Sequence, residues 1–457
     1  MVQHSNWNNV IVCILLSLFA INTFGQTKSF SREQMVQDID TLFSTIEKVH
    51  PDMYAVYPKQ KLEQDIEKVK SEIKPSGDIF YFYKEVAPLV VNLGDGHTNL
   101  FPPFFPPFLV PEDFANFLLF PFSVKVTYPD EIIRVQKDYT KQNIIPIGAQ
   151  ITSINNIKAD SIVQEMMNYS TGEKEFYRID KLELAFTPLM CILYQDSVFD
   201  IDYLFNQGKH SVQVKGISHK ERYENQRQNS NEDNKSYTFS TLPDKNIGII
   251  EFNECIDLDR FKVFLDSTFQ VLQKENIGNL IIDVRKNGGG ESSLGEELCQ
   301  YISPVPFAQY DKTITKYSDI LKQYKKTKYN QETTNPNGIE IYNSEMIKLR
   351  ENPLRYKGNV FLLISHHTFS AASDFSWNFK YFKMGTIVGE ETGGMNVCFG
   401  DMISLQLPNT GLFYGISYKK WYSYGATDDD IHGTLPDYNV EAENALDFTI
   451  DLITQRK

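Results

Sequence analysis

Two short, strongly apolar segments constrain the possible fold of this chain most, because each is too short for a helix and lacks the alternation of a half-exposed strand. Residues 279–285 read Asn-Leu-Ile-Ile-Asp-Val-Arg, and residues 359–365 read Asn-Val-Phe-Leu-Leu-Ile-Ser. Such runs are typical of strands covered on both faces, as in a parallel sheet between helices. From about residue 246 onward, predicted strands alternate with predicted helices at residues 258–273, 292–301 and 370–382. The pattern therefore predicts an α/β domain.

The chain of 457 residues is too long for one ordinary core, and the pattern changes twice before the α/β region. Residues 31–93 carry apolar positions at helical spacing, and Pro51 ends the first helix. From about residue 120 the pattern changes to short strands with one or two helices. We expect a signal peptide at 1–25, an N-terminal helical domain at 26–115, a mixed module at 118–218 and an α/β domain at 236–457.

Three segments differ in composition from the predicted helices and strands around them. Residues 101–111 are rich in Pro and Phe and are interpreted as a linker. Residues 220–235 are polar and charged, and we expect a loop or linker there. Residues 307–357, polar and rich in Tyr and Lys, resemble an insertion that could form a lid or rim over a site.

The N-terminus is interpreted as an export signal. Residues 10–21 form an apolar block of signal-peptide length that is too short to span a bilayer comfortably. Small residues at Thr23 and Gly25 predict cleavage before Gln26, although residues 1–9 contain no Lys or Arg. The alternative is a buried helix or an uncleaved anchor. We expect a periplasmic or secreted protein without a later transmembrane segment.

The formal net charge of −14 disfavours nucleic acid and anionic membranes as partners. Four cysteines follow the predicted signal peptide, at positions that lack metal-ligand spacing. We expect buried thiols, with one disulfide possible and its pairing undetermined. We expect neither a metal nor a cofactor.

A nucleophile candidate follows the second apolar run. Ser370 lies after a short turn, at the start of a predicted helix that begins with small residues. Free backbone N–H groups and the helix dipole favour a developing oxyanion at such a position. From this segment alone, however, a serine that merely caps the helix is the more common case.

Three consecutive glycines, at residues 288–290, follow the first apolar run. Glycine lets the backbone approach a ligand closely and turn its N–H groups toward an anion. An oxyanion hole is the favoured interpretation. Phosphate binding is the second, although neither a Walker pattern nor a GxGxxG is present and Glu291 would repel phosphate. A plain tight turn is the third.

A serine hydroxyl needs a neighbouring base before it is an effective nucleophile. The chain has eight histidines, and His97 stands between Gly96 and Thr98 in a predicted loop after a helix. An imidazole there could be exposed to a substrate, whereas most single histidines are structural or solvated.

Five segments in order resemble the tail-specific and tricorn-core serine peptidases. They are Gly94-Asp-Gly-His-Thr98, residues 280–290, Thr368-Phe-Ser-Ala-Ala372, Gly389-Glu-Glu-Thr-Gly-Gly394 and Gly433-Thr-Leu-Pro-Asp437. Val49-His-Pro-Asp-Met-Tyr54 is similar to the N-terminal helical segment of these enzymes, and residues 148–155 resemble a strand of their PDZ-like module. The resemblance implies a ClpP/crotonase-like spiral catalytic domain, an N-terminal helical domain and a PDZ-like module that binds peptide ends.

The two branches of this family activate serine differently. Met395 stands where the branch with a Ser-Lys dyad has its lysine, so the chain resembles the tricorn-like branch, which uses the histidine of the Asp-Gly-His motif. The resemblance then implies Ser370 as nucleophile, His97 as base and Asp430 as the assisting acid. Asp428 and Asp429 stay open as alternatives, and Ser373 departs from the acidic residue common in the family.

The implied oxyanion donors are the N–H groups of Ala371 and Gly289, with Gly288 as the alternate. The expected function is hydrolysis of peptide bonds in unfolded or C-terminal segments through an acyl-enzyme. One alternative is a catalytically weak or inactive protein of the same fold that binds peptides or hydrophobic ligands. A second alternative is an esterase of the α/β-hydrolase fold, but Thr368 and Ala372 occupy the glycine positions of its Gly-x-Ser-x-Gly elbow.

Overall fold

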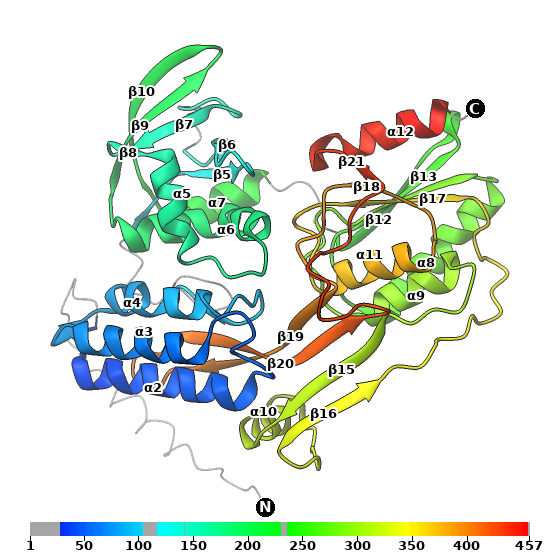
Figure 1. The fold of residues 1–457 in the computed structure, drawn as a ribbon. Coiled ribbons are helices and arrows are strands. Elements are labelled where there is room, and N and C mark those ends of the chain that lie inside the picture. Colours follow the sequence, from blue (N-terminus) through cyan, green and yellow to red (C-terminus); the bar gives the residue numbers. More distant parts are fainter. Residues whose placement is uncertain (1–27, 104–116, 141, 230–234, 456–457) are drawn as a thin grey trace, which may run out of the picture.

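The computed structural model describes residues 28–103, 117–140, 142–229 and 235–455 (Figure 1). The predicted signal peptide at 1–25 and most of the predicted linker at 101–111 lie outside the described residues. In the part of the chain that the structure describes, no helix is both long enough and apolar enough to cross a membrane.

A six-stranded sheet forms the centre of the C-terminal half. Its order is β12-β13-β14-β17-β18-β21, with β12 antiparallel to β13 and the other neighbours parallel. The strands are β12 (Tyr237–Leu242), β13 (Ile247–Phe252), β14 (Asn279–Asp283), β17 (Asn359–Ile364), β18 (Thr386–Gly389) and β21 (Tyr438–Asn439). The two apolar runs of the sequence are thus adjacent parallel strands, β14 and β17.

Helices cover both faces of this sheet, which explains why the two runs show no alternation. On one face, Ile282 and Leu362 share a core with α8 (Leu258–Lys274), α9 (Ser293–Ile302) and α11 (Ala371–Tyr381). On the other face, Ile281 and Phe361 pack with α12 (Ala445–Gln455). The predicted α/β organisation is confirmed, whereas the spiral ClpP/crotonase-like description stays a prediction.

A second sheet has the order β16-β15-β20-β19, and β3 pairs with the start of β20, at Tyr414 and Gly415. Its strands are β3 (Asn99–Leu100), β15 (Tyr310–Tyr317), β16 (Gly338–Asn343), β19 (Val397–Gln406) and β20 (Phe413–Ser423). The interval 307–357, expected to be an insertion, supplies β15, β16 and the helix α10 (Asp319–Tyr329). Its proposed role as a lid stays untested.

The N-terminal helices lie on the β19–β20 hairpin, which extends away from the six-stranded sheet (Figure 1). They are α2 (Arg32–Val49), α3 (Lys59–Glu72) and α4 (Ile79–Val91), accompanied by the short strands β1 (Phe30–Ser31) and β2 (Ser76–Gly77). Ser31 and Gln34 form the capping box that starts α2. The buried Asp38 carboxylate of α2 accepts hydrogen bonds from the N–H and the hydroxyl of Thr410, in the loop between β19 and β20.

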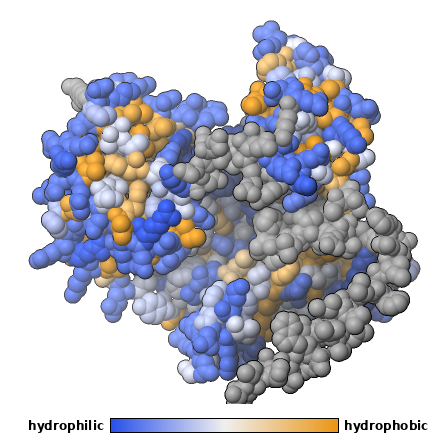
Figure 2. Space-filling model, turned by 180° about the vertical axis from the view of Figure 1, so that it is seen from behind, coloured by the Kyte–Doolittle hydropathy of each residue, from blue (hydrophilic) through white to orange (hydrophobic). Residues whose placement is uncertain are grey.

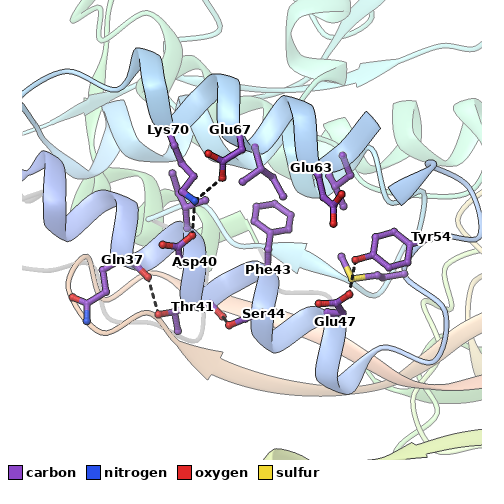
Figure 3. A pocket seen from close by; sticks show the side chains of 14 residues that line it. Gln37, Asp40, Thr41, Phe43, Ser44, Glu47, Tyr54, Glu63, Glu67 and Lys70 are labelled. Carbon is purple, nitrogen blue, oxygen red and sulfur yellow. Dashed lines mark hydrogen bonds and ion pairs between the residues drawn. The ribbon is translucent and has the colours of Figure 1, made fainter. Parts of the chain in front are cut away.

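A hollow of about 630 Å³ lies between α2 and α3 (Figure 3). Phe43 faces it, and Lys70 of α3 reaches across to Asp40 of α2 and back to Glu67. These ion pairs lie at one end of the hollow (Figure 3).

The middle part of the chain forms a sheet of order β10-β9-β7-β6-β5, with β8 paired to β7. Its strands are β5 (Phe122–Val126), β6 (Ile133–Asp138), β7 (Gln150–Ile154), β8 (Ile157–Lys158), β9 (Val198–Phe205) and β10 (Gly208–Lys215), all antiparallel to their neighbours. The helices α5 (Ala159–Met167) and α6 (Glu175–Leu193) accompany the sheet, and β4 (Leu118–Leu119) pairs with β11 (Ile217–Ser218). From behind, the molecular surface is hollowed between this part and the C-terminal part (Figure 2).

One local expectation is wrong. Residues 220–235 were expected to be a loop, but most of the described part of this segment belongs to the helix α7 (His219–Asn229). The helix has almost no apolar side chains, so its sequence carries no helical periodicity. Tertiary contacts hold it instead: the Asn225 amide donates to the Tyr139 carbonyl, and Arg222 donates to the Phe120 carbonyl.

Candidate active site

Ser370 follows the end of β17 and occupies the N-cap position of α11, as the sequence predicted. Its side chain makes no capping hydrogen bond, so the interpretation of Ser370 as a simple helix cap does not hold. Its backbone has φ 51° and ψ −131°, a conformation that a non-glycine residue rarely adopts. Strain of this kind is common where the fold must present one side chain to a reaction.

His97 comes from a loop nearly three hundred residues earlier in the chain. The loop follows α4 and runs directly into β3, which pairs with β20, so the second sheet fixes its position. The imidazole stacks on the Phe369 ring with 4.6 Å between ring centroids. Because Phe369 directly precedes Ser370, this stack brings the imidazole beside the candidate nucleophile.

The Nε2 atom of His97 lies 3.2 Å from Oγ of Ser370, across 273 residues of sequence. This is hydrogen-bond distance, and it is the arrangement in which an imidazole can remove the hydroxyl proton. The structure thus brings together the two residues that the sequence singled out from different halves of the chain.

The carboxylate next to His97 is Asp95, two residues earlier in the same loop. Its Oδ1 accepts the backbone N–H of His97 at 2.8 Å and lies 3.9 Å from Nδ1 of the imidazole. Its Oδ2 accepts the Ser417 hydroxyl at 2.7 Å and faces Nε2 of His50 at 3.2 Å. Asp95 is 1% exposed, so these contacts replace solvent around its charge.

These neighbours decide the protonation of Asp95 and His97. Burial favours a raised pKa for Asp95, but the hydrogen bond from His50, the neighbouring His97 and the Thr98 side chain hold the pKa well below its usual range. Burial lowers the pKa of His97, an effect that the Asp95 charge opposes and the Lys181 charge reinforces. The imidazole is therefore biased toward the neutral form, which is the form that accepts a proton.

Asp430, expected to assist the base, is held elsewhere. Its Oδ2 accepts the Asn396 amide at 3.2 Å and its Oδ1 accepts the backbone N–H of His432 at 3.1 Å. Among the described residues, no hydrogen bond or ion pair joins Asp430 to His97. Asp428, one of its alternatives, bonds Lys420 and Tyr422. Sequence reasoning did not single out Asp95, although it lies within the Asp-Gly-His motif.

The triple-glycine segment lies directly against Ser370. Gly289 has φ +101°, and a Cβ at this position would lie 2.7 Å from Cβ of Ser370 and 3.1 Å from N of Ala371. The N–H of Gly289 already donates to Oδ1 of the buried Asn287 at 2.9 Å. The N–H groups of Ala371 and Gly288 have no hydrogen-bond partner in the described part of the chain.

A hollow of about 590 Å³ adjoins the glycines. Gly288, Gly289 and Gly290 form one wall, and the other lining residues include Lys286 and Glu254. Since Gly289 contacts Ser370, this hollow lies within one residue of the candidate nucleophile. It offers room for a peptide backbone beside the glycine N–H groups.

Sequence reasoning missed two ionisable residues, Glu173 and Lys181, close to the His97 loop. Glu173 precedes α6, and Oε2 of its carboxylate would be 2.9 Å from a Cβ at Gly96. Neither carboxylate oxygen has a hydrogen-bond partner among the described residues. Burial and the Asp95 charge raise the pKa of Glu173 to about 8, and burial lowers the pKa of Lys181 to about 8. No local motif marks these residues, because only the fold brings α6 to the loop.

A second acidic residue with a raised pKa, Asp374, lies in the first turn of α11, close to the candidate nucleophile. The Asp374 carboxylate, one helical turn after Ser370, accepts the Tyr310 hydroxyl at 2.8 Å. Burial raises the pKa of Asp374 to about 7. Tyr310 belongs to β15, so the interval expected to be an insertion in fact supports the start of α11.

A serine, an imidazole and a glycine wall are thus brought together in one place. Residues 246–440 match the family model described as peptidase family S41. Among solved structures, CPAF in complex with lactacystin is similar, with a TM-score of 0.65 and 13% identity over 93% of this chain and 98% of that chain. A mutant form of CPAF gives a TM-score of 0.67 and 14% identity over 93% and 97% of the two chains. At this identity the likeness to CPAF shows a shared fold.

Proposed function

We propose that this chain hydrolyses peptide bonds by an acyl-enzyme mechanism, with Ser370 as nucleophile and His97 as general base. The observation that carries the proposal is the 3.2 Å contact between Nε2 of His97 and Oγ of Ser370. In the first step, Oγ attacks the peptide carbonyl while Nε2 takes its proton. The protonated imidazole then gives that proton to the leaving amine, and water completes the reverse sequence on the acyl-enzyme.

The oxyanion of the tetrahedral intermediate is assigned to the N–H groups of Ala371 and Gly288. The N-terminus of α11 adds a favourable dipole at this point. Gly289, a predicted donor, already gives its N–H to Asn287, so its main contribution is to let the loop lie against Ser370. The 590 Å³ hollow beside these glycines would receive the substrate backbone.

Asp95 replaces Asp430 in the proposed mechanism as the carboxylate that supports the base. Its position 3.9 Å from Nδ1 of His97 is too long for a hydrogen bond, but catalytic contacts often shorten when substrate binds. The negative charge also stabilises the imidazolium that forms during each proton transfer.

The proposed substrates are unfolded or C-terminal peptide segments. Residues 118–218, interpreted as PDZ-like, would recruit them by adding a strand to an exposed sheet edge, since β10 and β5 end the sheet of this module. An exported location is proposed from the apolar block at residues 10–21. Finding secreted or periplasmic protein that starts at Gln26 would support it.

The experiment that tests the proposal is cleavage of a library of unfolded peptides by the purified protein and its Ser370→Ala and His97→Ala variants. Cleavage by wild type that both substitutions abolish, in variants with unchanged circular dichroism, would support the mechanism. Peptide binding without cleavage would favour the alternative of an inactive binding protein. Retained ester hydrolysis without peptide cleavage would favour the esterase.

A further inference from the structure

His50 stands at the junction of the N-terminal helices and the His97 loop. It is the C-cap residue of α2, where its backbone N–H donates to the Ile46 carbonyl and Pro51 follows. Its carbonyl accepts the Nζ of Lys316 from β15 at 2.9 Å. The imidazole is 1% exposed and packs at 4.4 Å between ring centroids against Phe399 of β19. The backbone of His50 is therefore fixed by α2 and β15, and its ring packs on β19.

The hydrogen bonds of His50 define its tautomer. The backbone N–H of Asp52 donates to Nδ1 at 3.2 Å, so Nδ1 carries the lone pair. The proton must then be on Nε2, which faces Oδ2 of Asp95 at 3.2 Å. Nε2 of His50 is thus a donor aimed at the carboxylate, and the turn after α2 sets the position of its proton.

The two carboxylate oxygens of Asp95 contact different groups. Oδ2 accepts from His50 and Ser417, whereas Oδ1 accepts the His97 backbone N–H and faces the His97 imidazole. A carboxylate that rotated about its Cβ–Cγ bond would lose contacts on both sides. The donors on Oδ2 therefore control where Oδ1 lies relative to the catalytic ring.

We propose that His50 is a positioning residue for the peptidase reaction, which acts through Asp95 to hold His97 in line with Ser370. The proposal rests on the proposed function, because it assigns His97 as the base. The Ser370–His97 pair is then part of a series of neighbouring side chains, Ser370, His97, Asp95 and His50, that joins the two halves of the chain. The N-terminal helices then do more than cover the β19–β20 hairpin, since α2 ends in a donor for the active site.

The test compares His50→Phe, which removes the donor but keeps a ring, with His50→Gln, whose amide nitrogen can occupy the place of Nε2. His50→Asn is the second variant, because its amide reaches only the place of Nδ1. The rate of Ser370 modification by a fluorophosphonate reports on the base without any need for a known peptide. Steady-state kcat and KM on a cleaved peptide complete the measurement.

We expect His50→Phe and His50→Asn to lower the fluorophosphonate rate and kcat about 10- to 100-fold, because a small displacement of a catalytic group has effects of this size. KM should change by less than about twofold, since His50 does not contact the substrate hollow. His50→Gln should recover most of the loss.

Thr410→Val is the matched control. It removes a buried hydrogen bond from the β19–β20 hairpin to Asp38, which lies in the N-terminal half of α2, well away from His50. We expect it to lower the melting temperature, yet to keep the wild-type fluorophosphonate rate. Equal loss of that rate in Thr410→Val and His50→Phe would overturn the positioning role, as would a wild-type rate in His50→Phe. A wild-type protein that the fluorophosphonate does not modify would instead contradict the proposed function itself.

Discussion

Gly289 lies so close to Ser370 that no side chain fits between them. A Cβ on Gly289 would be 2.7 Å from Cβ of Ser370 and 2.9 Å from the carbonyl oxygen of Phe369, and φ at Gly289 is +101°. Both the contact and the dihedral angle require glycine. Gly288, one residue earlier, has nothing within 4 Å of its virtual Cβ.

We therefore expect opposite effects from two neighbouring alanine substitutions. Gly289→Ala should lower the melting temperature by several degrees and displace Ser370, because backbone atoms block the new methyl group. Gly288→Ala should leave the melting temperature within about one degree of wild type. Thermal unfolding followed by circular dichroism measures both. Equal melting temperatures for the two variants would contradict the tight contact between Gly289 and Ser370.

Asp95 and Asp430 provide a second matched comparison. Asp95 lies in the His97 loop and accepts the backbone N–H of His97, whereas Asp430 accepts hydrogen bonds from Asn396 and His432. We expect Asp95→Asn to lower kcat by about 10²- to 10⁴-fold, since the loss of a triad carboxylate in serine proteases is of this order. Asp430→Asn should lower it by less than about tenfold. Peptide hydrolysis under saturating substrate measures both, and a larger loss in Asp430→Asn would restore the assignment made from the sequence.

Much of the fold follows from local pattern. The segments that form β14 and β17 are strongly apolar because helices cover both faces of the sheet. Such a pattern predicts strands that are buried on both faces. The apolar spacing of Met35, Ile39 and Leu42 likewise defines α2, and all three residues are buried. Ser370 and His97 could be named because each lies in a recognisable motif.

The missed features depend on contacts between distant segments. The helix α7 has no apolar stripe, so only its bonds to Tyr139 and Phe120 reveal why it forms. Strand β15 could not be predicted from its polar sequence, because the strand with which it pairs, β20, lies about a hundred residues later. The roles of Asp95 and Asp430 could not be separated in the sequence, since spacing along the chain does not give the distance between side chains.

The pKa of His97 makes a prediction for the pH dependence of cleavage. The base must be neutral, so kcat/KM should rise as pH increases through the pKa of His97 in the free enzyme. Burial lowers this pKa from the ordinary value of 6.5, so the midpoint should lie below pH 6.5. Lys181→Met should move the midpoint to higher pH because the Lys181 charge lowers the pKa of His97, and Asp401→Asn should move it lower because the Asp401 charge raises that pKa. A midpoint that does not respond to either variant would contradict the assignment of His97.

The buried Glu173 carboxylate predicts how stability changes with pH. Burial raises the pKa of Glu173 to about 8 from an ordinary value of 4.5, so between these values the folded chain holds a proton that the unfolded chain releases. Folding stability from this group is therefore complete below about pH 4.5 and is lost as pH rises toward 8. Glu173→Gln keeps the shape of the protonated acid and cannot ionise.

We accordingly expect Glu173→Gln to melt close to wild type near pH 5 and several degrees above wild type near pH 8. Calorimetry at a series of pH values measures the difference. Glu175→Gln is the control, because it removes the same charge from an exposed residue in the first turn of α6, and it should give no such trend. A gain that shrinks as pH rises would mean that Glu173 is ionised in the folded protein, with Lys181 as its counter-ion beneath the His97 loop.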